Sequence, residues 1–464
     1  MKKLAYLLIL VPLLVGGWIV KDRATFDRAA WLADYQQLRS AVEQQYANLK
    51  WSRSSKNVDL VALNESALEQ LQQATTHSAA RRALVNFISG FRDAHFHIES
   101  GPPQPIAAVL GVFQREDDTV IELSMAAEEA CSALGFKKTS HKLAIDGVNQ
   151  LANSTFAAGT IKSTTGRTFG IIRIPLFRQH EYAAVCHRAW QSFSGARVGP
   201  CDEDCQYEFN NIAKHELAQA LADDATTLRQ LGAEAVIIDL TGNGGGTEWA
   251  ENAAAALTNR KLQSPGTAFV RGPHWEKSFS EVIANLDAVL KQSPHHPLRD
   301  LVIEGRDVAA AMRDSARTSC DLSGLWSERS LQPSCWNIVT NVPSPLPGED
   351  TDYVRPYGGP LYIMTDPHTA SASEQFAATL RDNAVAQTIG EPTMGIGCGY
   401  TNGGNPIMLK NSGIVVWMPD CVRLRRDGSN EFEGVKPDYP VEWGEDRASR
   451  SRALVSALDK LPKR

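Results

Sequence analysis

The sequence lacks the excess of basic residues that a nucleic-acid-binding surface requires. It holds 47 Lys and Arg against 53 Asp and Glu, for a formal net charge of −6, whereas phosphate recognition favours a basic protein. It also has no internal repeat and no low-complexity segment. With 22% charged and 43% hydrophobic residues, the composition excludes disorder, collagen and coiled coil as the overall class. We therefore expect no nucleic-acid partner, and a chain of 464 residues suggests roughly three globular domains.

Beyond the N-terminus the sequence has no apolar run long enough to span a membrane. The chain starts Met1-Lys2-Lys3 and carries no charge from Leu4 to Val20, the pattern of a secretory n-region and h-region. This run is borderline for a span of about 20 residues, and Gly16-Gly17 is the nearest approach to a cleavage site. We expect residues 1–25 to be a cleaved signal peptide or a retained signal anchor. The rest would be exported, either periplasmic or anchored in the inner membrane and facing the periplasm.

The sequence holds eight cysteines at irregular spacings, and an exported chain can form disulfides. Two pairs would each close a short loop, which leads us to expect two disulfides. They are Cys320 with Cys335 and Cys398 with Cys421. An alternative makes Cys201, Cys205 and His215 zinc ligands, but that segment lacks a second pair of ligands. We expect neither a metal nor a cofactor.

Hydrophobic spacing divides the chain into segments. Apolar residues recur every three or four positions at 31–49, 59–74 and 78–91, which predicts an N-terminal helical domain at 26–100. Short β-type runs at 119–123 and 142–145 predict a small β-rich module at 101–165.

Strand and helix patterns alternate from residue 166 onward. The predicted strands are 170–174, 235–240, 361–365 and 415–418, and the predicted helices are 209–231, 248–257 and 373–382. This order predicts an α/β core with a mixed sheet and crossover helices, formed by residues 166–262 and 357–464. Residues 263–356 are rich in Pro, Ser and His with one helix-like piece at 279–290. We expect them to be an insertion that limits access to the site as a lid, or else a surface excursion.

Three segments carry residue types suited to hydrolysis. The strand ending in Asp239 continues into a glycine-rich loop, Thr241-Gly-Asn-Gly-Gly-Gly246. Its N–H groups could serve a phosphate or an oxyanion, but it matches neither a P-loop nor a dinucleotide fingerprint. Alone it is equally well a tight turn.

The second segment is His368-Thr-Ala-Ser-Ala-Ser-Glu374, which follows a predicted strand. A serine at a strand-to-helix turn exposes its hydroxyl, although Ser371 with Glu374 also forms a helix N-cap box.

The third segment is Arg92-Asp-Ala-His-Phe-His97. Histidine is the usual base for a serine nucleophile, and metal binding by His95 and His97 is the alternative.

Together these segments resemble the C-terminal processing peptidase and tricorn core serine peptidase family. Ile389-Gly-Glu-Pro-Thr-Met-Gly395 and Glu433-Gly-Val-Lys-Pro-Asp438 add to the resemblance, in the family's order and spacing. It implies a crotonase-like core and hydrolysis of peptides or unfolded proteins. Lys142–Val148 resembles the strand and turn of a PDZ domain, which implies a reduced, PDZ-like module within residues 101–165.

The family has two branches that differ in the base. In one branch a lysine stands about 25 residues after the serine, and here Ile396 occupies that position. The chain therefore resembles the tricorn-like branch, which uses serine, histidine and glutamate. This implies Ser371 as nucleophile, His95 as base, and Glu431 as the group that orients the base, directly or through another hydroxyl. Glu433 is the alternative orienter.

The resemblance also implies how the oxyanion of the tetrahedral intermediate is bound. The N–H of Ala372 and that of Gly245 or Gly246 would form the oxyanion hole. The chain is therefore expected to be an exported serine peptidase that works through an acyl-enzyme. The alternatives are a non-catalytic binding protein on the same scaffold and a hydrolase of esters.

Overall fold

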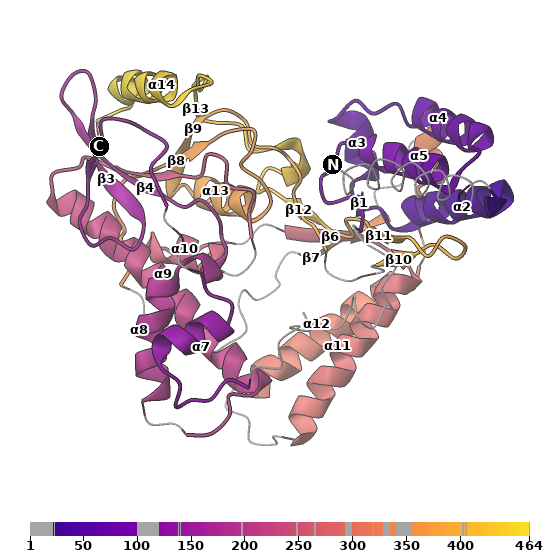
Figure 1. Cartoon of the computed structure of the whole chain (residues 1–464), viewed down its shortest axis with the longest axis horizontal. Helices are drawn as coiled ribbons and strands as arrows, with labels where there is room; N and C mark the ends of the chain where they lie inside the picture. Colours follow the sequence, from indigo (N-terminus) through magenta and orange to yellow (C-terminus); the bar gives the residue numbers. More distant parts are fainter. Residues whose placement is uncertain are drawn as a thin grey trace, which may run out of the picture. The chain divides into compact units, whose positions relative to one another are not determined.

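The structure is a computed structural model that describes most of the chain. The described residues are 22, 24–99, 120–137, 139, 141–195, 198–246, 249–263, 266–292, 299–318, 320–327, 335–339, 355–400, 403 and 406–463. The predicted signal segment at 1–25 lies almost entirely outside them. The chain divides into two compact units, each assembled from segments far apart in sequence (Figure 1). The helical unit comprises residues 1–114, 267–338 and 398–422, and the sheet unit comprises residues 115–266, 339–397 and 423–464.

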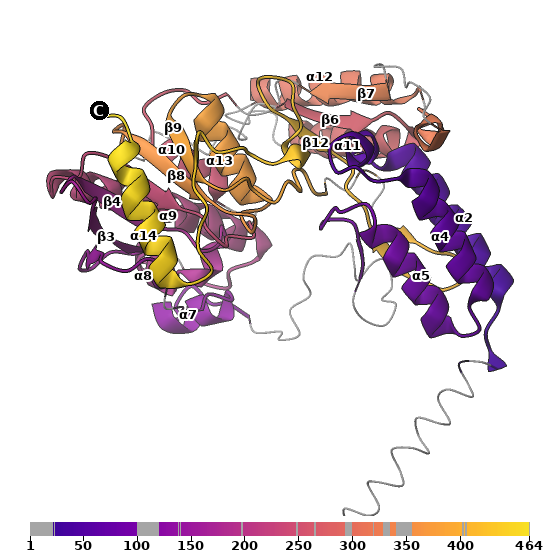
Figure 2. The same ribbon diagram turned by 90° about the horizontal axis from the view of Figure 1, so that it is seen from above.

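The N-terminal helices form as their apolar spacing predicts. They are α2 (Arg28–Gln45), α3 (Leu49–Ser54), α4 (Leu60–Gln73) and α5 (His77–Ser89). The side chains of Asp27, Asp59 and Thr76 accept backbone N–H groups at the starts of α2, α4 and α5, which satisfies donors that a helix leaves unpaired. The helices pack on one another (Figure 2), and η2 (Ser323–Ser327) joins the same core.

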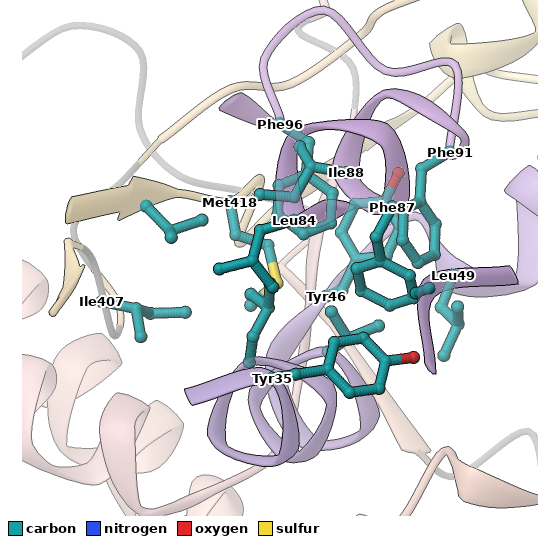
Figure 3. Close-up of a cluster of buried hydrophobic side chains, with 14 of the residues drawn as sticks. Tyr35, Tyr46, Leu49, Leu84, Phe87, Ile88, Phe91, Phe96, Ile407 and Met418 are labelled. Carbon is teal, nitrogen blue, oxygen red and sulfur yellow. The ribbon is translucent and has the colours of Figure 1, made fainter. Parts of the chain in front are cut away.

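Aromatic side chains fill the core of the helical unit. Tyr35 and Phe91 each meet Phe87 edge to face, at ring distances of 5.0 and 5.2 Å, a favourable geometry for aromatic pairs. Ile407 and Met418 enter the same cluster from the C-terminal part of the chain (Figure 3). Ile407 lies in β10 (Ile407–Met408), and Met418 directly follows β11 (Val415–Trp417). These two strands form a three-stranded sheet with β1 (His97–Ile98), in the order β1-β11-β10. The core thus joins segments more than 300 residues apart.

The predicted insertion at 263–356, in which the sequence indicates one helix, contains two long helices. These are α11 (Pro273–Gln292) and α12 (Arg299–Ala316), which pack against each other, with Arg306 bonded to Asp287 at 2.9 Å. The sequence indicates only the middle of α11. α12, in which Ala309 and Ala316 are buried, is not among the predicted helices.

The sheet unit confirms the predicted α/β core. Its seven-stranded sheet has the order β13-β9-β8-β5-β4-β3-β2. The strands are β2 (Asn149–Gln150), β3 (Ala157–Lys162), β4 (Thr168–Arg173), β5 (Val236–Asp239), β8 (Leu361–Thr365), β9 (Ala386–Gly390) and β13 (Tyr439–Pro440). β4, β5, β8, β9 and β13 pair in parallel, and β2 and β3 are antiparallel. The sheet is therefore mixed but mostly parallel.

Helices cover both faces of this sheet (Figure 1). α9 (Glu203–Gln230), α10 (Ala250–Ala256) and α13 (Ala372–Asp382) pack on the face that carries Ile172, Ile238 and Ile363. α14 (Arg447–Lys460) packs on the opposite face, with Ile171 and Ile237. Adjacent residues of one strand thus enter different cores, which explains why β4 and β5 read as continuous apolar runs. α7 (Ala127–Ala133) and α8 (Ala183–Ser194) form a further cluster with α9.

Two predictions for residues 101–165 are not met. The predicted strand at 142–145 is absent, although Leu143 and Ile145 are buried against the α14 face. Of the predicted strand at 119–123, only Glu122 pairs, in an isolated bridge with Pro200, and residue 119 lies outside the described residues. β2 and β3 belong to the seven-stranded sheet, so the PDZ-like module is not confirmed.

A third sheet consists of β12 (Val422–Leu424), β6 (Gly266–Val270) and β7 (Trp336–Val339), in that order. It includes the residues at which the chain passes from one unit to the other.

All eight cysteines form disulfides. The pairs are Cys131–Cys186, Cys201–Cys205, Cys320–Cys335 and Cys398–Cys421. Both predicted pairs are confirmed, and a disulfide takes the two thiols of the zinc alternative. Four disulfides fit an exported protein. No helix within the described residues is long and apolar enough to cross a membrane.

Candidate active site

Ser371 stands at the turn between β8 and α13. β8 is buried along its whole length, so the turn starts from a rigid strand. Ser371 has φ 56° and ψ −118°, in a region that residues with a Cβ rarely adopt. A serine in such a strand-to-helix turn has the geometry of a nucleophile elbow, which presents the hydroxyl outward.

The glycine-rich loop after β5 packs directly against Ser371. A Cβ on Gly245 would meet the Ser371 Cβ at 2.8 Å and a neighbouring carbonyl oxygen at 2.9 Å. Gly245 and Gly246 have φ of 104° and 124°, which glycine alone adopts readily. Asn243 braces the loop, because its side-chain nitrogen donates to the Ile174 carbonyl at 2.8 Å. The close approach and the positive φ together explain why positions 245 and 246 hold glycine.

The three predicted oxyanion donors differ in how they are engaged. The Gly245 N–H donates to Asn243 Oδ1 at 2.9 Å. Ala372 is the first residue of α13, and a first helical N–H has no acceptor in its own helix. Neither Ala372 nor Gly246 donates its N–H to an acceptor among the described residues. These two N–H groups are therefore available to a ligand.

An arginine from a neighbouring strand supports the base of this loop. Arg173 on β4 donates to Asp239 Oδ2 at 2.8 Å and to the Thr241 carbonyl at 2.9 Å. Position 241, at the start of this loop, holds threonine. The guanidinium that supports the loop comes from β4. Because the pairing of β4 with β5 creates this contact, no sequence motif reveals it.

Glu374 is a buried carboxylate that ties a second turn to the elbow. It accepts the Ser371 N–H at 3.0 Å, as its N-cap box predicts. It also accepts the Thr393 hydroxyl and the Gly395 N–H, both at 2.6 Å, and the Ile396 N–H at 3.1 Å. This turn would carry the base lysine of the other branch, and here it holds a buried Ile396. The sequence indicates the cap but not this second set of bonds.

Arg423, which no motif singles out, connects Ser371 to Glu431. Its Nε donates to Glu431 Oε2 at 2.6 Å, and its Nη2 donates to the Ser371 carbonyl at 3.2 Å. Glu431 is fully buried, and its Oε1 has no hydrogen-bond partner among the described residues. Burial raises the pKa of Glu431, and the Arg423 guanidinium opposes that rise. Glu433, the alternative, is exposed.

His95 belongs to the helical unit, in the turn between α5 and β1. Asp93 Oδ1 accepts the His95 N–H at 3.1 Å, while Asp93 Oδ2 accepts the Tyr46 hydroxyl at 2.9 Å and the Asn48 side chain at 3.1 Å. Burial raises the pKa of Asp93 to about 6. The Tyr400 ring meets the His95 ring edge-on at 5.6 Å, and its hydroxyl donates to the His95 carbonyl. A buried polar network thus holds the backbone of this turn.

The predicted residues fall into two groups. Within the sheet unit, Ser371, Ala372, Gly245, Gly246 and Glu431 are brought together around the elbow. His95 and His97 lie in the helical unit, where His97 is exposed. Within the described ranges, no three His, Cys, Asp or Glu side chains are grouped so as to hold a metal ion.

The fold of this chain matches solved structures, and its sequence matches a protein family. The fold resembles the crystal structure of mature CPAF, with 15% identity, a TM-score of 0.54, and coverage of 94% of this chain and 97% of that one. Mature CPAF complexed with lactacystin matches with 15% identity, a TM-score of 0.52, and coverage of 93% and 97%. The sequence model of peptidase family S41 matches residues 169–441, more than half of the chain. This protein belongs to peptidase family S41.

Proposed function

We propose that this protein is an exported serine peptidase of the tricorn-like branch. It hydrolyses peptide bonds through an acyl-enzyme on Ser371, with His95 as general base and Glu431 as the group that orients the base. No cofactor takes part. Its substrates are peptides or unfolded proteins.

The observation that carries this proposal is the contact between Ser371 and the glycine-rich loop. Ser371 has a positive φ, and Gly245 lies so close that a Cβ there would come within 2.8 Å of the Ser371 Cβ. A helix cap alone requires neither feature. The N–H groups of Ala372 and Gly246 lie at this junction and have no acceptor among the described residues. They are the donors that we assign to the oxyanion, each worth about 3 kcal/mol in the transition state.

Two features support histidine rather than lysine as the base. Ile396 occupies the lysine position, and the backbone of its turn is bonded to Glu374. Glu431 is buried with Oε1 unpartnered among the described residues, whereas Glu433 is exposed. A buried carboxylate with one open oxygen suits the orientation of an imidazole, so Glu431 is the better candidate.

The test is covalent labelling with a fluorophosphonate, combined with hydrolysis of an unfolded protein. The wild type should label, and Ser371→Ala should neither label nor hydrolyse. Ser373→Ala is the matched control, because Ser373 is buried two residues further on and its hydroxyl has no partner among the described residues. Labelling of Ser371→Ala would overturn the assignment. A wild type that binds peptides without cleaving them would favour the non-catalytic alternative, and cleavage of esters alone would favour an esterase.

A further inference from the structure

Arg423 contacts four groups around the elbow with one side chain. It donates to Glu431 Oε2 at 2.6 Å, to the Gly397 carbonyl at 3.0 Å, to the Ser371 carbonyl at 3.2 Å and to Gln375 Oε1 at 3.3 Å. It lies on β12, and 13% of its side chain is exposed. Only a guanidinium offers several donors in a fixed fork, so lysine could make some of these bonds but not all.

The first consequence concerns the charge of Glu431. This carboxylate is fully buried, and burial alone favours its neutral form. Arg423 bonds it directly, Arg425 adds a further favourable charge, and Glu374 opposes ionisation. A neutral Glu431 would no longer stabilise a protonated histidine. The role proposed for Glu431 therefore depends on Arg423.

The second consequence concerns the backbone of the nucleophile. The positive φ of Ser371 persists only if its surroundings hold it there. Arg423 holds the carbonyl of Ser371 from one side, while Glu374 holds its N–H. The same guanidinium holds the Gly397 carbonyl, at the end of the turn that Glu374 organises. One side chain thus fixes both the elbow and the turn beside it.

We propose that Arg423 is a positioning residue for peptide hydrolysis, which keeps Glu431 a carboxylate and holds the backbone of Ser371 and Gly397. This rests on the proposed function, and it adds a residue that no motif identifies. Arg423 acts through Glu431 and the elbow, not by contact with substrate. Its loss should therefore reduce kcat and leave KM nearly unchanged.

Arg425 provides the matched control. It is also buried, with 7% of its side chain exposed, and its Nε donates to Asp382 Oδ2 at 2.6 Å at the far end of α13. Arg423→Met and Arg425→Met each remove a buried ion pair, but only the first removes contacts with the elbow. We expect kcat to fall about 100-fold or more in Arg423→Met, as small misplacements of reacting groups cause, and only a few-fold in Arg425→Met. Equal losses in the two variants would overturn the proposal.

The pH dependence of kcat separates positioning from a general loss of stability. In Arg423→Met the acid limb should move to higher pH, because Glu431 then protonates more readily. It should move much less in Arg425→Met, which removes only the weaker of the two favourable charges on Glu431, and should not move in Arg423→Lys, which keeps the charge. Arg423→Lys should still lose kcat, since lysine cannot hold both carbonyls. An unmoved acid limb in Arg423→Met would refute the effect on Glu431.

A double-mutant cycle with Glu431 completes the test, and a second variant replaces Arg423→Met if that variant does not fold. If Arg423 acts largely through Glu431, adding Arg423→Met to Glu431→Gln should cost far less than adding it to the wild type; full additivity would contradict the proposal. If Arg423→Met does not fold, Arg423→Lys decides, because wild-type kcat in that variant would overturn the role in holding the backbone. Failure of the proposed function can be distinguished from failure of the Arg423 proposal. In that case the wild type itself would neither label nor hydrolyse, and both proposals would be wrong.

Discussion

Gly245 and Ser371 approach so closely that the loop after β5 leaves no room for a side chain at position 245. A Cβ there would lie 2.8 Å from the Ser371 Cβ and 3.0 Å from the Ala372 nitrogen. The glycine-rich loop and the serine turn are more than 120 residues apart in sequence, yet they form a single site. Taken alone, the loop is compatible with a tight turn and the serine with a helix cap. The contact between them favours the catalytic interpretation.

Gly245→Ala should therefore inactivate the protein. The added methyl group clashes with the elbow, and its φ of 104° is strained for alanine. We expect kcat to fall about 100-fold and the unfolding free energy to fall by about 1–3 kcal/mol. Gly244→Ala is the control, because a Cβ on Gly244 meets nothing within 4 Å. Comparable activity in the two variants would contradict the close packing.

His95→Ala should abolish hydrolysis and leave the fold intact. Removal of a base from a serine site typically costs about 10⁴–10⁶-fold in kcat. His97→Ala is the control, since His97 is exposed two residues further along. Wild-type hydrolysis by the His95 variant, with far-UV circular dichroism unchanged, would remove His95 from the mechanism.

No lysine should serve as the base. Ile396 stands at the expected lysine position, and the nearest lysines in sequence on its C-terminal side, Lys410 and Lys436, are both exposed. We expect Lys410→Ala and Lys436→Ala to keep kcat within a few-fold, and activity to fall as the pH drops through about 6.5. A collapse of kcat in either variant would revive a serine–lysine dyad.

Asp93 should make the stability of the helical unit depend on pH. Burial raises its pKa to about 6 from an ordinary value of 3.8, so the folded state binds the proton more tightly than the unfolded state. The contribution of Asp93 to the unfolding free energy is then largest below about pH 4 and declines as the pH rises to about 6. The full change corresponds to about 3 kcal/mol.

The measurement compares denaturation midpoints of the wild type and Asp93→Asn between pH 4 and pH 7. Asparagine does not titrate, so the stability of the wild type relative to the variant should fall across this range. Parallel curves would show that Asp93 titrates as it does in the unfolded chain.

The α11–α12 hairpin is a candidate lid, and truncation tests this. Because Arg306 bonds Asp287, residues 281 and 312 lie opposite each other in the hairpin, and a short Gly/Ser linker can replace what lies between them. This leaves Leu322, Leu325 and Trp326 in the core of the helical unit. If the hairpin limits access, kcat/KM should rise for a folded protein and stay constant for a short peptide. Unchanged values for both substrates would identify a surface excursion.

Elements with a local signal could be predicted from the amino-acid sequence alone. β8 and the turn to α13 follow from a buried apolar run ended by a cap box, and the glycine loop follows from its composition. The disulfides Cys320–Cys335 and Cys398–Cys421 follow from short spacing. In each case the residues that cause the feature are close together in the chain.

The contacts that support these elements form between segments distant in sequence and could not be predicted from it. Arg173 and Arg423 are single arginines on short strands, and nothing near them in sequence marks the carbonyl and carboxylate oxygens that they bond. Glu374 reads as a cap until folding brings the turn at Ile396 against it. A local pattern can encode a turn or a helix, but the partner of a buried charge is set by which strands and helices pack together.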